Sequence, residues 1–114
     1  MEYRKIEQIA SQLKQCLIDG FPFIFGLQIY KSFEDPIVSA TGIVKTPVIE
    51  TEEHLGGHAL MCVGFDEDKR IFIIRNSWGE KWGQKGYCEI PYDYILNPKL
   101  AADFWTLTRI ENSK

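Results

Sequence analysis

The sequence predicts an α+β fold with a mostly antiparallel sheet and one packed helix at the N-terminal end. Residues 2–18 carry apolar side chains at helical spacing, and Asp19-Gly20 is a typical helix stop. Five later segments are rich in β-branched and aromatic residues and are bounded by turn residues, which is typical of neighbouring antiparallel strands. These predicted strands are residues 21–30, 58–65, 70–76, 86–92 and 103–110.

The segments between the predicted strands are expected to be connections. Residues 31–53 carry Pro36, Gly42 and Pro47 and are expected to be irregular, with a short strand at 41–44 as an option. A loop and a turn or short helix are expected at residues 79–85 and 93–96. The chain has 114 residues, 45% hydrophobic and 25% charged, so it is expected to form a single domain over residues 1–114.

The most informative prediction is a hairpin formed by residues 58–65 and 70–76, with a polar turn between them. If the strands fold antiparallel about residue 67, His58 lies opposite Asn76. Directly opposed side chains share one face of the sheet, and their Cβ atoms lie about 4.5–5.5 Å apart. That separation is within hydrogen-bonding reach for an imidazole and a carboxamide.

The same pairing has further consequences along the hairpin. It places Leu60 opposite Ile74 and Cys62 opposite Phe72. The alternate positions are also apolar, so both faces of the hairpin are expected to lie in a core. A slip of one residue would put the histidine and the asparagine on opposite faces, which makes the prediction sensitive to a β-bulge.

A histidine beside an asparagine forms two thirds of a Cys-His-Asn catalytic set. An imidazole can take the proton of a thiol and hold the thiolate as an ion pair, which lowers a cysteine pKa from about 8.5 to about 3–4. A neighbouring asparagine can fix the orientation and tautomer of the ring without adding negative charge. Trp78, two residues after Asn76, is expected to cover the pair and exclude water, which would strengthen the hydrogen bond.

Several ordered motifs resemble the C-terminal half of papain-like cysteine proteases. They are Gly57-His58-Ala59, Val63-Gly64-Phe65, Arg75-Asn76-Ser77-Trp78-Gly79, Trp82-Gly83 and Gly86-Tyr87. The resemblance runs from about Gly20 to the end of the chain, and residues 101–106 resemble the last strand of that fold. It implies that the sheet curls like a small barrel with the helix packed on it, as in the right-hand lobe of the family fold.

The resemblance also implies roles for individual residues. His58 is the catalytic base, Asn76 orients it, and Trp78 shields both from water. A pocket for the substrate side chain one residue beyond the scissile one is implied at Gly26, Gly57 and Ala59. No cofactor is implied, and the substrate would be a peptide or protein.

The nucleophile of the family is missing from the sequence as we interpret it. In papain-like enzymes the cysteine motif lies about 130 residues or more before the histidine. Only 57 residues precede His58, and they contain no such motif. Cys16 lies on the apolar stripe of the predicted helix, while Cys62 and Cys88 lie within predicted strands. All three are therefore expected to be buried structural residues, because free cysteine commonly packs as a small hydrophobe.

Other site chemistries are less favoured by the sequence. His54, His58 and Cys62 are spaced four apart, which could bind zinc on a helix, but Gly56-Gly57 break the helix. No metal site is therefore expected, and His54 is expected to be an exposed loop residue. The net charge of −3 predicts no nucleic-acid or membrane partner, and the sequence shows neither a transmembrane segment nor a signal peptide. A soluble chain of unknown location is expected.

Two functions remain open from the sequence. In the first, the chain is the His/Asn-bearing half of a cysteine peptidase and is inactive until a Cys-bearing N-terminal lobe completes it. In the second, it is a catalytically dead domain that binds peptides or proteins through its exposed cleft face.

Overall fold

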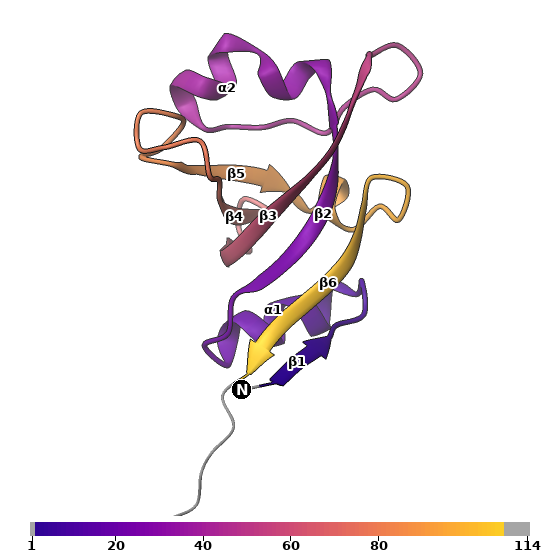
Figure 1. Ribbon diagram of the computed structural model, residues 1–114, viewed down its shortest axis with the longest axis vertical. Helices are drawn as coiled ribbons and strands as arrows, with labels where there is room; N and C mark the ends of the chain where they lie inside the picture. Colours follow the sequence, from indigo (N-terminus) through magenta and orange to yellow (C-terminus); the bar gives the residue numbers. More distant parts are fainter. Residues whose placement is uncertain (1, 109–114) are drawn as a thin grey trace, which may run out of the picture.

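The computed structural model of the chain describes residues 2–108, which form an antiparallel sheet with short helices (Figure 1). The six strands of this part pair in the order β1-β6-β2-β3-β4-β5. The strands are β1 (Glu2–Lys5), β2 (Phe23–Tyr30), β3 (His54–Asp66), β4 (Ile71–Arg75), β5 (Tyr87–Pro91) and β6 (Ala101–Thr108). The helices are α1 (Ala10–Ile18), the 3-10 helix η1 (Lys31–Glu34), α2 (Pro36–Thr41) and α3 (Tyr92–Ile95). The predicted α+β class is thus confirmed.

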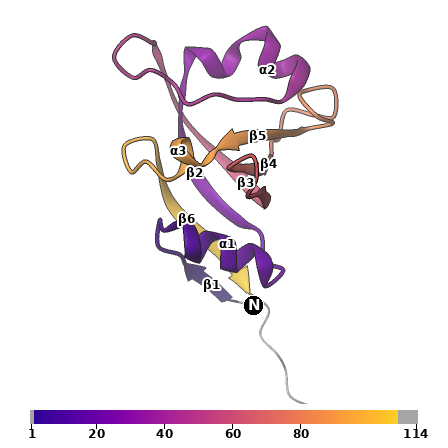
Figure 2. The same cartoon turned by 180° about the vertical axis from the view of Figure 1, so that it is seen from behind.

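The sheet is coiled, because β5 crosses the direction of β2 and β6 at a wide angle in Figure 1. Helix α1 packs on one face only: it lies behind β2 and β6 in Figure 1 and in front of them in Figure 2. Leu13 and Cys16 of α1 are buried against the sheet. In the described part of the chain, no helix has the length and apolar character needed to cross a membrane.

Two neighbouring rows of side chains show how the sheet is sided. Residues that pair directly across antiparallel strands point to the same face, and the next residue along each strand points to the other. One row is fully buried and forms the centre of the core: Thr106, Phe23, Cys62, Ile74 and Cys88. The adjacent row lies on the outer face: Lys5, Trp105, Ile24, Met61, Arg75 and Tyr87. The expectation that both faces of the hairpin lie in a core is therefore wrong, because Met61 and Val63 are exposed.

The predicted N-terminal helix is correct only in its second half. Residues 2–5 form β1 and pair with the end of β6, and the helix begins at Ala10. Ile6 continues the extended path, since its N–H donates to the carbonyl of Phe104 at 2.9 Å. The helical spacing of apolar residues is thus overridden by a strand partner about a hundred residues further along the chain.

The connection predicted to be irregular contains two short helices, η1 and α2. Asp35 begins α2, because its side chain accepts a hydrogen bond from the N–H of Ile37 at 2.9 Å. Pro36 occupies the first turn, where its missing N–H costs nothing. Gly42 ends the helix in a left-handed conformation, with φ of 73°. The optional strand at 41–44 is reduced to an isolated bridge between Ile43 and Glu89.

The remaining strands follow the prediction with shifted ends. Strand β3 begins at His54 rather than His58, and β5 covers Tyr87–Pro91. A one-turn helix, α3, follows at Tyr92–Ile95. Strand β6 begins at Ala101, two residues before the predicted start, and the predicted end at residue 110 lies outside the described residues.

Candidate functional site

The imidazole of His58 and the carboxamide of Asn76 meet at one end of the hairpin. The distance from His58 Nε2 to Asn76 Oδ1 is 3.1 Å, so the predicted contact is present. The predicted register is wrong, however. Cys62 pairs with Ile74 rather than with Phe72, and Asn76 lies just beyond the last residue of β4. The error is an even number of residues, so the side chains keep the predicted face.

A second hydrogen bond fixes the direction of the first. The backbone N–H of Ser77 donates to Asn76 Oδ1 at 2.7 Å, so this atom is the carbonyl oxygen of the amide. An oxygen of this kind only accepts, and His58 Nε2 must therefore carry a proton and donate it. In the neutral ring the lone pair then resides on Nδ1. The arrangement leaves Nδ1 free to take a proton from an incoming group.

Burial makes this asparagine a rigid element of the site. Asn76 is only 6% exposed, and its own N–H donates to the carbonyl of Gly86 at 2.9 Å. Its Nδ2 is buried without a hydrogen-bond partner among the described residues. A buried donor of this kind usually costs about 1–3 kcal/mol, so the carboxamide is held where it lies at a cost in stability.

Trp78 covers the imidazole as predicted. The two rings are stacked, with centroids 5.4 Å apart and planes inclined by 24°. Trp82 contacts Trp78 edge to face at 5.2 Å, and Phe33 contacts the same ring at 5.8 Å. The cover of His58 is thus one member of an aromatic cluster. The contributions of Trp82 and Phe33 were not found from the sequence, in which both are indistinguishable from core residues.

The three cysteines are buried free thiols. The Sγ of Cys16 donates to the carbonyl of Phe21 at 3.3 Å, and that of Cys62 donates to Gly64 at 3.5 Å. Burial raises the pKa of the Cys62 thiol well above its ordinary value and raises the pKa of Cys88 to about 12. These environments disfavour the thiolate, which is the nucleophilic form.

A hollow of about 300 Å³ lies beside His58 on the outer face of the sheet. The predicted pocket residues Gly26, Gly57 and Ala59 all line it. Its floor is low because a row of small residues crosses three strands there: Ala102 of β6 pairs with Gly26 of β2, which pairs with Ala59 of β3. Ala101 and Ala102 also line the hollow, and neither was assigned to the pocket from the sequence.

The histidine spacing that could have indicated zinc has another explanation. His54 is the exposed first residue of β3, and its Nε2 lies 2.6 Å from Oε1 of Gln28. No group of three or more metal-ligating side chains occurs among the described residues.

A coiled antiparallel sheet that presents an imidazole, a hydrogen-bonded carboxamide and an aromatic cover is the arrangement that the resemblance implied for one lobe of a cysteine-protease type of fold. Residues 1–101 match the family described as papain family cysteine protease, and the chain belongs to that family. Its sheet and few helices match the right-hand lobe of the papain-like fold, as the resemblance implied.

Individual relatives show the same kinship. Xylellain, a cysteine protease from Xylella fastidiosa, superposes with a TM-score of 0.84 at 41% identity, covering 97% of this chain and 41% of that chain. An uncharacterized peptidase C1-like protein of Acanthamoeba polyphaga mimivirus is 42% identical over 105 residues, or 92% of this chain and 33% of that protein. Pro-cathepsin H of Bos taurus is 35% identical over 71 residues, covering 58% of this chain and 19% of that protein. The chain therefore spans less than half the length of these relatives.

Proposed function

We propose that this chain supplies the general base of a papain-like cysteine peptidase and that a second, Cys-bearing lobe supplies the nucleophile. The observation that carries the proposal is the oriented pair of His58 and Asn76, with Nε2 and Oδ1 3.1 Å apart beneath the ring of Trp78. In this function Nδ1 of His58 takes the thiol proton, the thiolate attacks the peptide carbonyl, and the imidazolium returns the proton to the leaving amine.

The cysteines of the chain support a nucleophile from elsewhere. Each is a buried thiol, and burial raises the pKa of Cys62 and Cys88. A catalytic cysteine needs the opposite environment, partly exposed and with a depressed pKa. We infer that all three have packing roles, so the isolated chain has no peptidase activity of its own.

The outer face of the sheet offers a place for the second lobe. Trp105, Ile24, Met61 and Tyr87 lie in one row and are between 36% and 46% exposed. Trp105, Ile24 and Met61 are direct neighbours in this row, and Arg75 separates them from Tyr87. An exposed apolar band of this kind usually marks an interaction surface. The band runs into a hollow of about 610 Å³ that Asn76 and Ser77 also line, so a lobe seated on the band would border the His58–Asn76 pair.

The floor of a substrate cleft is expected where this band ends. Two residues along β2 and β3 from Ile24 and Met61, the outer face drops to Gly26 and Ala59. A lobe resting on the large side chains would leave the small ones uncovered. The hollow of about 300 Å³ at that step is wide enough for a substrate side chain, as the resemblance implies for Gly26, Gly57 and Ala59.

Complementation tests the proposal. The chain is mixed with a Cys-bearing lobe, either the natural one or the part of Xylellain that has no counterpart in this chain, and turnover of a peptide substrate is measured with and without a thiol-trapping inhibitor. We expect turnover only in the mixture, its loss with the inhibitor, and its loss with His58→Ala. Turnover that persists in His58→Ala, or none in a mixture shown to form a complex, would contradict the proposal.

The second candidate function is a catalytically dead module that binds peptides. It is favoured by the buried thiols together with the open hollow beside His58. This function predicts that the isolated chain binds peptides and that His58→Ala leaves their affinity unchanged. Binding measured by calorimetry on both proteins therefore separates the two candidates.

A further inference from the structure

We propose that Phe33 is a positioning residue that holds Trp78 over the imidazole of His58. This proposal rests on the proposed function, because shielding of His58 by Trp78 matters for catalysis only if His58 is the base. It assigns the connection between β2 and β3, which carries η1 and α2, to the support of the site.

The aromatic cluster is a chain of ring contacts from Phe33 through Trp82 and Trp78 to His58, which we call the ladder. The ring of Phe33 meets Trp78 at right angles, 5.8 Å between centroids, and stacks on Trp82 at 6.0 Å. Trp82 meets Trp78 at 83°, and Trp78 stacks on His58. Edge-to-face and offset stacks of this kind are the preferred geometries of aromatic pairs. Phe33 is 2% exposed whereas Trp78 is 44% exposed, so the anchored ring is Phe33.

Phe33 is anchored by the backbone of its own short helix. The N–H of Lys31 donates to the carbonyl of Glu53, and the N–H of Ser32 donates to Oε1 of Glu52, each at 2.9 Å. The other carboxylate oxygen of Glu52 accepts from the N–H of Val48 at 2.9 Å. The hydrogen bond from Ser32 lowers the pKa of this carboxyl, which keeps it ionised as an acceptor. Helix η1 is thereby tied to the last residues of the connection, 48–53, which lead into β3.

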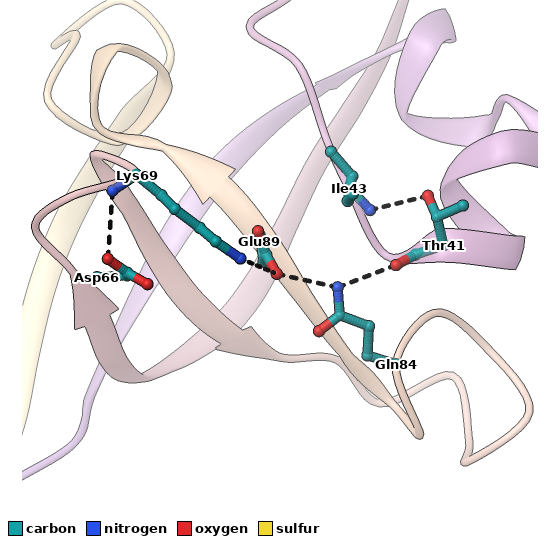
Figure 3. A network of polar contacts seen from close by, with 6 residues as sticks. All are labelled: Thr41, Ile43, Asp66, Lys69, Gln84 and Glu89. Atoms are coloured by element: carbon teal, nitrogen blue, oxygen red, sulfur yellow. Dashed lines mark hydrogen bonds and ion pairs between the residues drawn. The ribbon is translucent and has the colours of Figure 1, made fainter.

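The loop that carries Trp78 and Trp82 is tied to the same connection at a second point. The N–H of Gly83 donates to the carbonyl of Ser39 at 2.7 Å, and the amide of Gln84 donates to Thr41 and Glu89 (Figure 3). The approach is close enough to require glycine on both sides: a Cβ on Gly42 would lie 2.9 Å from Cγ of Gln84, and one on Gly83 would lie 3.3 Å from Cα of Gly42. A Cβ on Gly83 would also lie 2.6 Å from the carbonyl oxygen of Tyr87. We call these contacts of residues 39–42 with residues 83–84 the clasp.

The ladder and the clasp act on opposite ends of the loop. Phe33 touches the tryptophan rings, while the clasp holds the backbone that follows them. Because Trp78 is nearly half exposed, its own burial does not fix its ring plane. The plane of the Trp78 ring is set by its perpendicular contacts with the rings of Phe33 and Trp82. The same contacts keep Trp78 over the imidazole of His58, where it excludes water.

The test is the magnetic-resonance signature of His58 in the 114-residue chain with Phe33→Leu. This change keeps an apolar side chain of similar size and removes the aromatic edge. We expect the Trp78–His58 ring contact to be lost from nuclear Overhauser spectra and the ring-proton resonances to move toward those of an uncovered histidine. Exchange of the Nε2 proton with water is expected to become roughly three- to tenfold faster, which matches the strength of one aromatic contact.

Two further variants make every outcome decisive. Phe72→Leu removes a fully buried ring far from the ladder and is expected to leave the His58 resonances unchanged. Gln84→Ala loosens the exposed side of the clasp without touching the core and is expected to shift the same resonances by a smaller amount. Equal shifts in Phe72→Leu and Phe33→Leu would overturn the proposal. So would unchanged resonances in a folded Phe33→Leu protein, or, if that protein does not fold, unchanged resonances in Gln84→Ala. These readouts need no second lobe, so they are independent of the complementation result.

Discussion

At the scale of single residues, one hydrogen bond decides which nitrogen of His58 can act as a base. Ser77 donates to Asn76 Oδ1, which leaves that oxygen only able to accept from His58 Nε2. The proton is thus held on Nε2 by a neighbour that has no charge, and Nδ1 is left as the basic nitrogen that the proposed function needs. An aspartate at the same place would hold the ring too, but it would also stabilise the imidazolium.

Removing the carboxamide is expected to release this tautomer. In Asn76→Ala the Nε2 proton loses its acceptor, so the neutral ring should redistribute toward a mixture with the proton on Nδ1. Nitrogen chemical shifts of labelled histidine report the two tautomers directly. Gln28→Ala is the matched control, because it removes the partner of the other histidine, His54, and should leave His58 unchanged. An unaltered tautomer ratio in Asn76→Ala would contradict this account of the site.

The thiols provide a second prediction at this scale. Iodoacetamide attacks the thiolate, and burial raises the pKa of Cys62 and Cys88, so both should resist the reagent in the native chain at pH 8. Cys16 is 2% exposed and should resist it through lack of access. Mass spectrometry should therefore detect three modified residues only after unfolding in denaturant. A single thiol that reacts quickly in the native chain, and slowly in His58→Ala, would reveal a nucleophile within the chain.

At the scale of elements, the contact between His58 and Asn76 results from two slips in register that together amount to an even number of residues. Arg70 adopts a left-handed conformation, with φ of 55°, and belongs to the turn, so β4 begins only at Ile71. Beyond this turn Phe65 pairs with Phe72, a phase that would put His58 and Asn76 on opposite faces. The bulge between Cys62 and Gly64 shifts the pairing back by one residue, which leaves an offset of two from the predicted register and restores the face.

These slips explain how far the sequence could be followed. The alternation of side chains along a strand places Leu60 and Cys62 on one face, as predicted. Apolar residues on both faces hid which face is exposed, so Met61 and Val63 were wrongly expected in a core. Neither a bulge nor a turn residue in the left-handed region leaves a reliable mark on that alternation, so the pairing of Cys62 was wrong while its face was right. The pattern of single residues also could not find β1, whose partner is at the other end of the chain.

The clasp gives a prediction about stability. Gly83 has φ of 60°, so an alanine there would adopt a left-handed backbone and would also press its Cβ on the Tyr87 carbonyl. Gly20 has φ of 92°, but its Cβ would have nothing within 4 Å. Gly20→Ala should therefore cost about 1–2 kcal/mol of unfolding free energy from the backbone alone, and Gly83→Ala should cost clearly more. Urea denaturation of both variants measures the difference, and equal losses would show that the close approach carries no strain.

At the scale of the whole molecule, the two thiols in the buried row of the sheet are expected to make the free energy of unfolding fall at alkaline pH. Burial raises the pKa of Cys88 from 9.0 to about 12 and also raises the pKa of Cys62, whereas the unfolded chain has ordinary thiols. Their contribution is complete below pH 9 and declines as the pH rises toward 12, because only the unfolded state releases these protons. The free energy of unfolding should fall by about 1.4 kcal/mol per pH unit for each such thiol.

Denaturation in urea at a series of pH values from 8 to 11, under reducing conditions, measures this slope. Cys88→Ala removes one of the two thiols, so the free energy of unfolding of this variant should fall less steeply with pH, by the contribution of one thiol. This holds whatever the stability of the variant at pH 8. A slope that is the same in Cys88→Ala and in the unmodified chain would mean that Cys88 ionises equally well in both states, against its burial in the core.

The last prediction concerns the outer face of the sheet, where large apolar side chains lie near the pair formed by His58 and Asn76. Met61 lies in the middle of the exposed row, between Ile24 and Arg75, and is 36% exposed. If a Cys-bearing lobe seats there, Met61→Lys places a charge at the centre of the contact and should weaken the complex tenfold or more, about 1.4 kcal/mol. Ile37→Lys is the matched control, since Ile37 is even more exposed but lies on α2, away from the row. Calorimetric titration of the lobe with each variant gives the affinities, and circular dichroism verifies that both remain folded. Equal affinities for the two variants would place the lobe on another surface, and the proposed cleft above Gly26 and Ala59 would have to be abandoned with it.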